Sequence, residues 1–240
     1  MESFYQEKFR LRTSDFSMHD ELLPQAILDL FQDVAGKHAD NLKIGFNDLI
    51  HRDLIWVLLR SKFEIVKNPK LYSTVIVKTW PKQKGKIDFD REYLITDENG
   101  DVLVKGISKW VIVNFKTRRM SFTRDINYDC EILNDENFIG AFPKIEDFDI
   151  TNLDFYQDKT AFCDLDHNGH VNNAKYAKYI LNTIKLDKNE KIKSFQLDHI
   201  KELSPDIVIK NYYKRENKNI YVKGITEDNI VSYICKIELK

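Results

Sequence analysis

The stretch from Asp164 to Asn173 concentrates groups that could do chemistry: two carboxylates, two histidines and three asparagines within ten residues. Asp166, Asn168 and His170 stand at alternate positions in it. Hydrolysis of an activated acyl group needs a base to activate water and a donor to stabilise the oxyanion, and these residue types supply both. We interpret the stretch as an active site rather than as an Asx-rich turn that only caps a helix.

A helical pattern follows this stretch directly. Apolar residues recur at i, i+3, i+4 and i+7, namely Ala177, Ile180, Leu181 and Ile184. The pattern predicts a helix from Asn173, capped by Asn172 or Asn173. Because a helix start carries free N–H groups and partial positive charge, we expect N–H groups at Val171 and Asn172 to complete an oxyanion hole.

A calcium loop is the main alternative for the same residues. Asp164, Asp166, Asn168 and Gly169 match the first positions of an EF-hand loop, whose twelfth position must be a bidentate Glu. That position is Lys175, a cation where the ion needs an anion. Calcium is therefore rejected, and we expect neither a metal nor a cofactor.

Composition limits the class of protein. The 240 residues are 42% hydrophobic with a formal net charge of -1, so the chain can bury a core and has no global basic field for nucleic acid. The three cysteines fit neither a zinc site nor a disulfide framework. The first twelve residues lack the apolar core of a leader, and no run approaches the roughly 20 apolar residues of a membrane span. These features predict a cytoplasmic location.

The elements around the site repeat. An extended segment at residues 4–11 precedes a helix over 22–42, and strands are predicted at 54–66, 72–80, 88–96 and 102–115. Asn99-Gly100 predicts a two-residue hairpin turn. An extended segment at 155–163, the helix from Asn173 and strands at 194–203, 207–214, 220–225 and 230–239 repeat the plan. We therefore divide the chain into residues 1–126, a linker over 127–150, and residues 151–240.

The repeat has a testable register. Placing Asp15 on Asp164, an offset of 149 residues, puts Phe16 on Leu165 and Leu22 on Val171. The polar residues differ, since Ser17, His19 and Glu21 fall on Asp166, Asn168 and His170. The first half is then expected to bind the acyl chain without catalysing, and the second to react.

One helix wrapped by a curved antiparallel sheet, made twice, is an α+β tandem hotdog fold. The sequence resembles the acyl-ACP thioesterases, as a bacterial relative of the plant fatty acyl-ACP hydrolases. The resemblance rests on Asp164–Asn173, which matches the family signature Asp-Leu-Asp-x-Asn-x-His-Val-Asn-Asn, and on Trp56–Leu58, Val77–Pro81 and Ser108–Val111.

The resemblance implies hydrolysis of fatty acyl-ACP, with Asp166, Asn168, His170 and Glu202 as catalytic residues. Glu202, expected on a strand bordering the helix, is the candidate base, and a direct role for Asp166 stays open. Plant members commonly have Cys after this Glu, whereas Leu203 follows it here, so we expect attack by water. An acyl-CoA thioesterase and a non-catalytic acyl-binding protein are the alternatives.

The expected partner is acyl carrier protein, which is small and acidic, so its docking surface should be basic. Three clusters qualify: Lys82, Lys84 and Lys86; Arg118, Arg119 and Arg124; and Lys175 with Lys178. The acyl pocket is expected between the sheet and the first helix, with Leu30 or Phe31 closing its end. The sequence also allows a homodimer.

Overall fold

The computed structural model describes residues 3–126, 128, 130–133, 137 and 142–240. Its α-helices are α1 (Pro24–Asn41), α2 (Phe46–Ile50) and α3 (Lys175–Ile184). Its strands are β1 (Tyr5–Arg10), β2 (Leu54–Ile65), β3 (Thr74–Pro81), β4 (Asp88–Asp97), β5 (Val102–Asn114), β6 (Arg119–Met120), β7 (Phe155–Lys159), β8 (Ile192–His199), β9 (Val208–Glu216), β10 (Asn219–Thr226) and β11 (Val231–Leu239). The predicted helices and strands form, but β8 ends at His199 rather than at residue 203, and α2 and β6 were not predicted.

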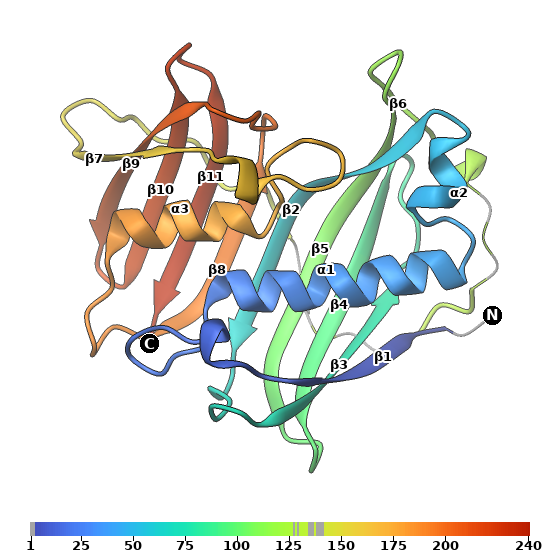
Figure 1. The fold of residues 1–240 in the computed structure, drawn as a ribbon, viewed down its shortest axis with the longest axis horizontal. Helices are drawn as coiled ribbons and strands as arrows, with labels where there is room; N and C mark the ends of the chain where they lie inside the picture. The colour runs from blue at the N-terminus through green and yellow to red at the C-terminus, as the bar shows by residue number, and fades with distance from the viewer. Residues whose placement is uncertain (1–2, 127, 129, 134–136, 138–141) are drawn as a thin grey trace.

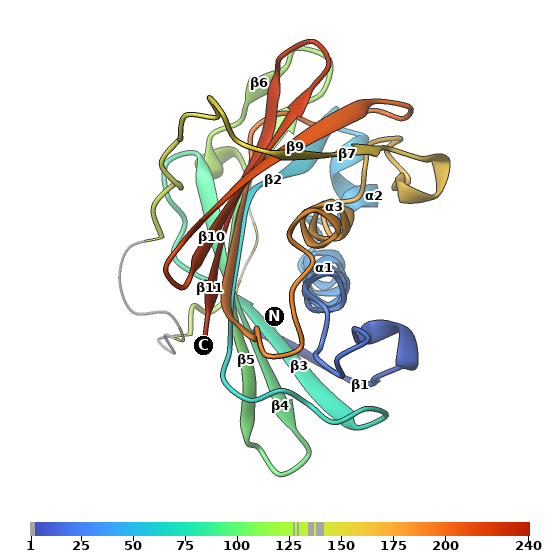
Figure 2. The same cartoon turned by 90° about the vertical axis from the view of Figure 1, so that its left-hand side faces the viewer.

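All the strands belong to one antiparallel sheet in the order β1-β3-β4-β5-β2-β8-β11-β10-β9-β7, with β6 added beside β5. The helices α1 and α3 lie on the same face of this sheet, which curves around them (Figures 1 and 2). Their apolar stripes pack on the alternate strand residues that face them, and this cluster is the main core. The tandem hotdog prediction is confirmed.

The two halves meet at the pairing of β2 with β8, where Phe63 lies opposite Phe195. Both rings are fully buried and stack with their centroids 5.2 Å apart. Aromatic pairs across a strand pair add packing energy to the ladder of backbone hydrogen bonds. The sheet is therefore continuous from one half to the other.

The predicted repeat register holds at the start of each half. Bridges join Phe16 to Leu22 and Leu165 to Val171, residues that the offset of 149 superposes. The backbone N–H of Ser17 donates to the carbonyl of Glu21 (2.8 Å), as that of Asp166 donates to His170 (2.8 Å). The same backbone turn is thus built twice with different side chains.

The hairpin at Asn99-Gly100 forms, but its predicted two-residue turn is wrong. Asp97 N–H donates to the carbonyl of Asp101 (3.0 Å), Gly100 N–H donates to the carbonyl of Asp97 (3.1 Å), and Gly100 has φ +91°. This is a three-residue connection with a glycine in the left-handed region. The Asp97 side chain favours it by accepting the N–H groups of Asn99 and Asp101 (both 2.9 Å).

The predicted linker is described only in part, since residues 127, 129, 134–136 and 138–141 lie outside the described residues. From residue 142 it crosses the face of the sheet opposite the helices (Figure 2). Ile145 N–H donates to the buried carboxylate of Asp198 (2.8 Å), and Lys223 bonds the carbonyl of Phe148. Among the described helices, none is long and apolar enough to cross a membrane.

Candidate active site

The reactive stretch forms a tight turn between Leu165 and Val171. Gly169 N–H donates to the carbonyl of Asp166 (3.0 Å), and Gly169 has φ +78°, a conformation that glycine adopts without a Cβ penalty. The turn directs Asp166 and Asn168 toward one side. Its geometry explains why a glycine stands between Asn168 and His170.

Asp166 organises this turn with its carboxylate. Its Oδ1 accepts the N–H groups of Asn168 (2.8 Å) and His170 (3.4 Å), and its Oδ2 accepts the side-chain amide of Asn168 (3.4 Å). The amide of Asn168 is thereby oriented, and its second N–H remains available for a ligand. The side-chain-to-backbone contacts recur in the first half, where Ser17 Oγ accepts the N–H groups of His19 (3.2 Å) and Glu21 (3.3 Å).

His170 and Glu202 come together from segments far apart in the sequence. The Nε2 of His170 lies 3.6 Å from Oε2 of Glu202, and the side chains are 34% and 40% exposed. Glu202 does not lie on a strand as predicted, because β8 ends at His199. A carboxylate beside an imidazole at a solvent-accessible position can accept a proton from water.

Backbone contacts hold the segment that carries Glu202. Ser232 on β11 accepts the N–H groups of Ile200 (2.8 Å) and Lys201 (3.0 Å) with its carbonyl oxygen. The N–H of Leu203 donates to the hydroxyl of Tyr176 on α3 (3.1 Å), and its carbonyl accepts the N–H of Val171 (3.0 Å). Leu203 thus ties Glu202 to both the helix and the turn.

The predicted oxyanion donors Val171 and Asn172 do not fit the structure. The N–H of Val171 donates to Leu203, and that of Asn172 donates to the carbonyl of Asp164 (2.9 Å). Both amides are therefore committed to holding the turn. Asn172 instead caps the chain ahead of the helix, since its Oδ1 accepts the N–H of Ala174 (2.9 Å), and α3 begins at Lys175 rather than at Asn173.

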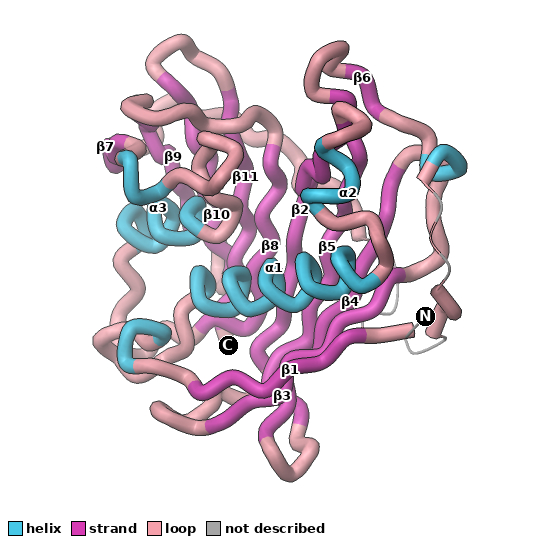
Figure 3. The backbone as a smooth tube through the Cα atoms, turned by 45° about the vertical axis from the view of Figure 1, so that its right-hand side comes forward, coloured by secondary structure: helices cyan, strands magenta, loops and turns pink. Residues whose placement is uncertain are grey.

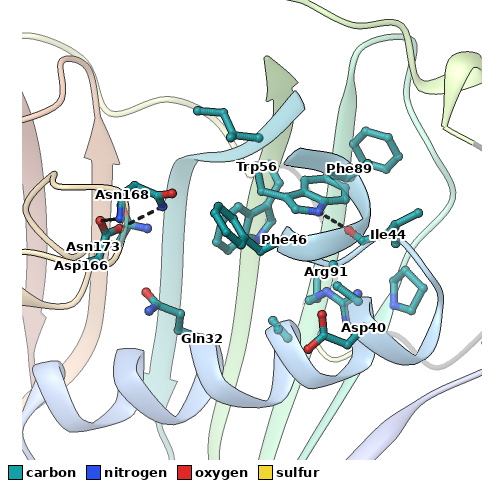
Figure 4. A pocket seen from close by; sticks show the side chains of 18 of the residues that line it. Gln32, Asp40, Ile44, Phe46, Trp56, Phe89, Arg91, Asp166, Asn168 and Asn173 are labelled. Atoms are coloured by element: carbon teal, nitrogen blue, oxygen red, sulfur yellow. Dashed lines mark hydrogen bonds between the residues drawn. The ribbon is translucent and has the colours of Figure 1, made fainter. Parts of the chain in front are cut away.

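A cavity of about 250 Å³ opens beside the turn. Figure 4 shows Asp166, Asn168 and Asn173 on one side of it, with the aromatic rings of Phe46, Trp56 and Phe89 opposite. Gln32 and Asp40 of α1 form part of its wall. The walls are mostly apolar and the polar groups of the turn stand at one end, an arrangement typical of a site for a small apolar ligand.

The cavity lies between α1 and the first-half sheet, where the acyl pocket was predicted. Phe31 stacks on Tyr93 with ring centroids 4.2 Å apart, and both line a smaller hollow of about 20 Å³ that shares Gln32, Trp110 and Asn173 with the main cavity. Leu30 packs against the core instead. Of the two residues proposed to close the pocket, Phe31 is therefore the one that lies beside it.

Several polar groups near the turn are structural. Burial raises the pKa of the Asp164 carboxyl, but hydrogen bonds from Tyr179 (2.8 Å) and Lys178 (3.1 Å) outweigh it and hold that pKa below its usual range. Burial lowers the pKa of His199 to about 3, so its ring is neutral. His167 packs edge-on against Phe46 (4.4 Å). His167 also lines the cavity, and neither His167 nor His199 is assigned a catalytic role.

Sequence reasoning missed Tyr176, and it named Arg118 only as part of a basic cluster, without its contact to Glu202. Tyr176 lies on the apolar face of α3, where a buried hydroxyl needs a partner, and that requirement was the available signal. Arg118, whose Nη1 lies 3.9 Å from Oε2 of Glu202, comes from the other half of the chain. No spacing in the sequence indicates that contact.

The fold is a tandem hotdog, and a polar turn stands beside its apolar cavity. Two family models match the chain: acyl-ACP thioesterase N-terminal domain over residues 2–128, and acyl-ACP thioesterase C-terminal domain over residues 149–238. The chain therefore belongs to the acyl-ACP thioesterase family.

Two plant relatives are similar to the chain. The chain is 28% identical to the chloroplastic oleoyl-acyl carrier protein thioesterase 2 of Arabidopsis thaliana, over 94% of this chain and 66% of that protein. It is 27% identical to a chloroplastic acyl-[acyl-carrier-protein] hydrolase of Cuphea viscosissima, over 86% of this chain and 54% of that protein. The chain thus spans less than two thirds of the length of these relatives.

Two solved structures share the fold. An acyl-ACP thioesterase from Bacteroides thetaiotaomicron superposes with a TM-score of 0.87 at 21% identity, covering 99% of this chain and 98% of that one. The 12:0-ACP thioesterase from Umbellularia californica gives 0.83 at 22% identity, covering 99% and 97%.

Proposed function

We propose that the chain hydrolyses the thioester of fatty acyl-[acyl-carrier-protein], releasing the fatty acid and the carrier thiol. The observation that carries this proposal is the pairing of His170 with Glu202 (3.6 Å) beside a turn whose Asp166 and Asn168 line an apolar cavity. Family membership supports the substrate class. The acyl chain would occupy the cavity in the first half, with its thioester at the turn.

Water is the nucleophile in this mechanism. Glu202 accepts a proton from water as the water oxygen attacks the thioester carbonyl, and His170 orients that water or relays its proton. The tetrahedral oxyanion then collapses and expels the thiolate, which takes up a proton as it leaves. Leu203 stands where a thiol nucleophile would have to be, so no acyl-enzyme is expected at that position.

Donors for the oxyanion come from the cavity side of the turn. The free amide N–H of Asn168 is one, since Asp166 fixes the orientation of that side chain. The backbone N–H of Asn173 is the second, because Asn173 lines the cavity and its N–H makes no hydrogen bond within the described part of the chain. Losing one such donor typically costs ~10²–10³ in rate.

Release of free thiol from acyl-ACPs of different lengths, with matching acyl-CoAs alongside, tests the proposal. Glu202→Gln should lower kcat by at least ~10² because it removes the base while keeping the side-chain shape. The matched control is Glu227→Gln in the exposed turn between β10 and β11, which should leave kcat unchanged.

The outcomes separate the alternatives. Activity that survives in Glu202→Gln would move the base to Asp166 or His170. Hydrolysis of acyl-CoA equal to that of acyl-ACP would assign the chain to the acyl-CoA thioesterases, and a folded wild type that binds fatty acid without cleaving any thioester would make it an acyl-binding protein.

A further inference from the structure

Two of the three basic clusters in the sequence form a single surface. The loop that carries Lys84 and Lys86 lies against the segment after β6: Thr123 N–H donates to the carbonyl of Lys86 (3.1 Å), and Thr123 Oγ1 donates to that of Gly85 (2.6 Å). The ammonium of Lys84 closes the contact on the carbonyl of Ile126 (2.9 Å). Segments that are 37 or 38 residues apart in the chain are thus fixed side by side.

We call the exposed residues of this region the β6 surface: Lys86, Arg118, Arg119, Met120, Phe122 and Arg124. It includes the hairpin that joins β5 to β6, which projects from the sheet next to α2 (Figures 1 and 3). Met120 is 53% exposed and Phe122 50%, and Arg124 lies over the ring of Phe122 at 4.7 Å. The surface therefore offers cations interleaved with exposed apolar side chains.

The β6 surface borders the catalytic centre. Arg118, at the tip of its hairpin, is the residue whose guanidinium lies 3.9 Å from Glu202. By contrast, Lys178 of the third cluster is bound to the buried carboxylate of Asp164 (3.1 Å), and Lys82 is bound to the buried Glu92 (2.9 Å). Those two ammonium groups are held by buried carboxylates, whereas Arg118 and Arg124 lie 3.9 Å from the exposed carboxylates of Glu202 and Asp125.

We infer that the β6 surface is where the acyl carrier protein docks. An acidic carrier protein matches this surface in charge, and the exposed apolar side chains among the cations can pack against the partner once it is seated. A carrier seated there would deliver its acyl thioester past Arg118 to Glu202 and on into the cavity. This inference rests on the proposed function for the identity of the partner.

Charge reversal at Arg119 and Arg124 tests the surface without altering Arg118. The double variant Arg119→Glu/Arg124→Glu should raise KM for acyl-ACP at least ~10-fold with kcat nearly unchanged, because long-range attraction sets the association rate. The same acyl group on pantetheine, which lacks phosphate and protein, should be hydrolysed with unchanged kcat/KM. Lys188→Glu/Lys218→Glu, an equal change of charge at exposed positions of the other half, is the control.

Salt provides a second readout. Raising NaCl from about 0.05 to about 0.3 M should increase KM for acyl-ACP in the wild type and much less in the Arg119/Arg124 variant, since exposed charges are screened over about 10 Å. An unchanged KM in that variant, or an equal rise in the Lys188/Lys218 control, would overturn the assignment.

Direct binding separates this inference from the proposed function. If the wild type cleaves neither thioester, the proposed function fails, and docking is then judged by titrating the protein with labelled holo-carrier protein. Weaker binding by the Arg119/Arg124 variant alone would sustain the docking surface. Equal binding by wild type and variant would refute it.

Discussion

At the scale of single residues, the position of Glu202 depends on its neighbour. Leu203 is held by the hydroxyl of Tyr176 and by the N–H of Val171, so the catalytic carboxylate is placed although it lies outside any strand. Tyr176 is not among the residues that line the cavity, so we expect it to act as a positioning residue through Leu203. Its hydroxyl is the group that a substitution can remove without changing the ring.

We predict that Tyr176→Phe lowers kcat about tenfold with KM unchanged, because the Leu203 N–H loses a partner worth ~1–3 kcal/mol. The informative measurement is a double-variant cycle with Glu202→Gln. If Tyr176 acts through Glu202, adding Tyr176→Phe to Glu202→Gln should cause no further loss. Tyr233→Phe removes another buried tyrosine hydroxyl of the same half and serves as the control; an equal fall in kcat there would reduce the role of Tyr176 to general packing.

His199 gives the stability a defined pH dependence. Its pKa is lowered by burial from 6.5 to about 3, and its buried Nε2 has no hydrogen-bond partner within the described residues. Between these values the unfolded chain binds a proton that the folded chain does not. The contribution of the neutral His199 ring to the unfolding free energy is therefore fully present above about pH 6.5. It is lost as the pH falls toward 3.

From pH 7.5 to pH 5 this effect should cost about 2 kcal/mol of unfolding free energy. The unfolding free energy is measured by denaturant titration at both pH values. The difference between the two pH values should be about 2 kcal/mol smaller in His199→Phe than in the wild type. The Phe ring still packs against Tyr176, as the His199 ring does. His51→Gln, at an exposed histidine, should retain the full wild-type difference. A His199→Phe protein with the same pH dependence as wild type would refute the assignment.

At the scale of elements, α1 combines a structural and a binding role. Gly36 lies in the middle of the helix and lines the cavity, and a Cβ added there would meet no atom within 4 Å. Glycine in a helix interior costs about 1 kcal/mol relative to alanine. The glycine therefore leaves space in the cavity at the expense of helix stability.

Gly36→Ala should raise the unfolding free energy by about 1 kcal/mol in a denaturant titration. Gly36→Leu should move the chain-length optimum in thiol-release assays toward shorter acyl groups, because the larger side chain fills the cavity. Asp33→Leu, one turn earlier on an exposed position outside the cavity wall, is the control. An unaltered chain-length profile in Gly36→Leu would show that the acyl chain does not pass this point.

Much of the fold could be predicted because helices and strands have different apolar periods, and the 149-residue offset followed from residue types alone. Glu202 was identified through the family resemblance, yet its place in a loop was missed because β8 ends early, at His199. The oxyanion donors were misplaced because hydrogen bonds to Asp164 and Leu203 cannot be read from local sequence. Contacts such as Arg118 with Glu202 depend on tertiary structure and leave no periodic signal.

At the scale of the whole molecule, the two halves behave as one body because β2 and β8 pair in the middle of a single sheet. The ladder runs antiparallel from Arg60 opposite Asp198 to Glu64 opposite Ser194. Each of these strands is the first long strand after the main helix of its half. The junction therefore joins equivalent elements.

An antiparallel pair of equivalent strands has local two-fold symmetry, and the stacked rings of Phe63 and Phe195 lie opposite each other within this pair. Such a contact is isologous, as in a symmetric dimer of identical subunits. The matching backbone turns at Ser17 and Asp166 fit the same two-fold relation between the halves. The architecture is that of a symmetric dimer within one chain, in which the second turn carries Asp166, Asn168 and His170 where the first carries Ser17, His19 and Glu21.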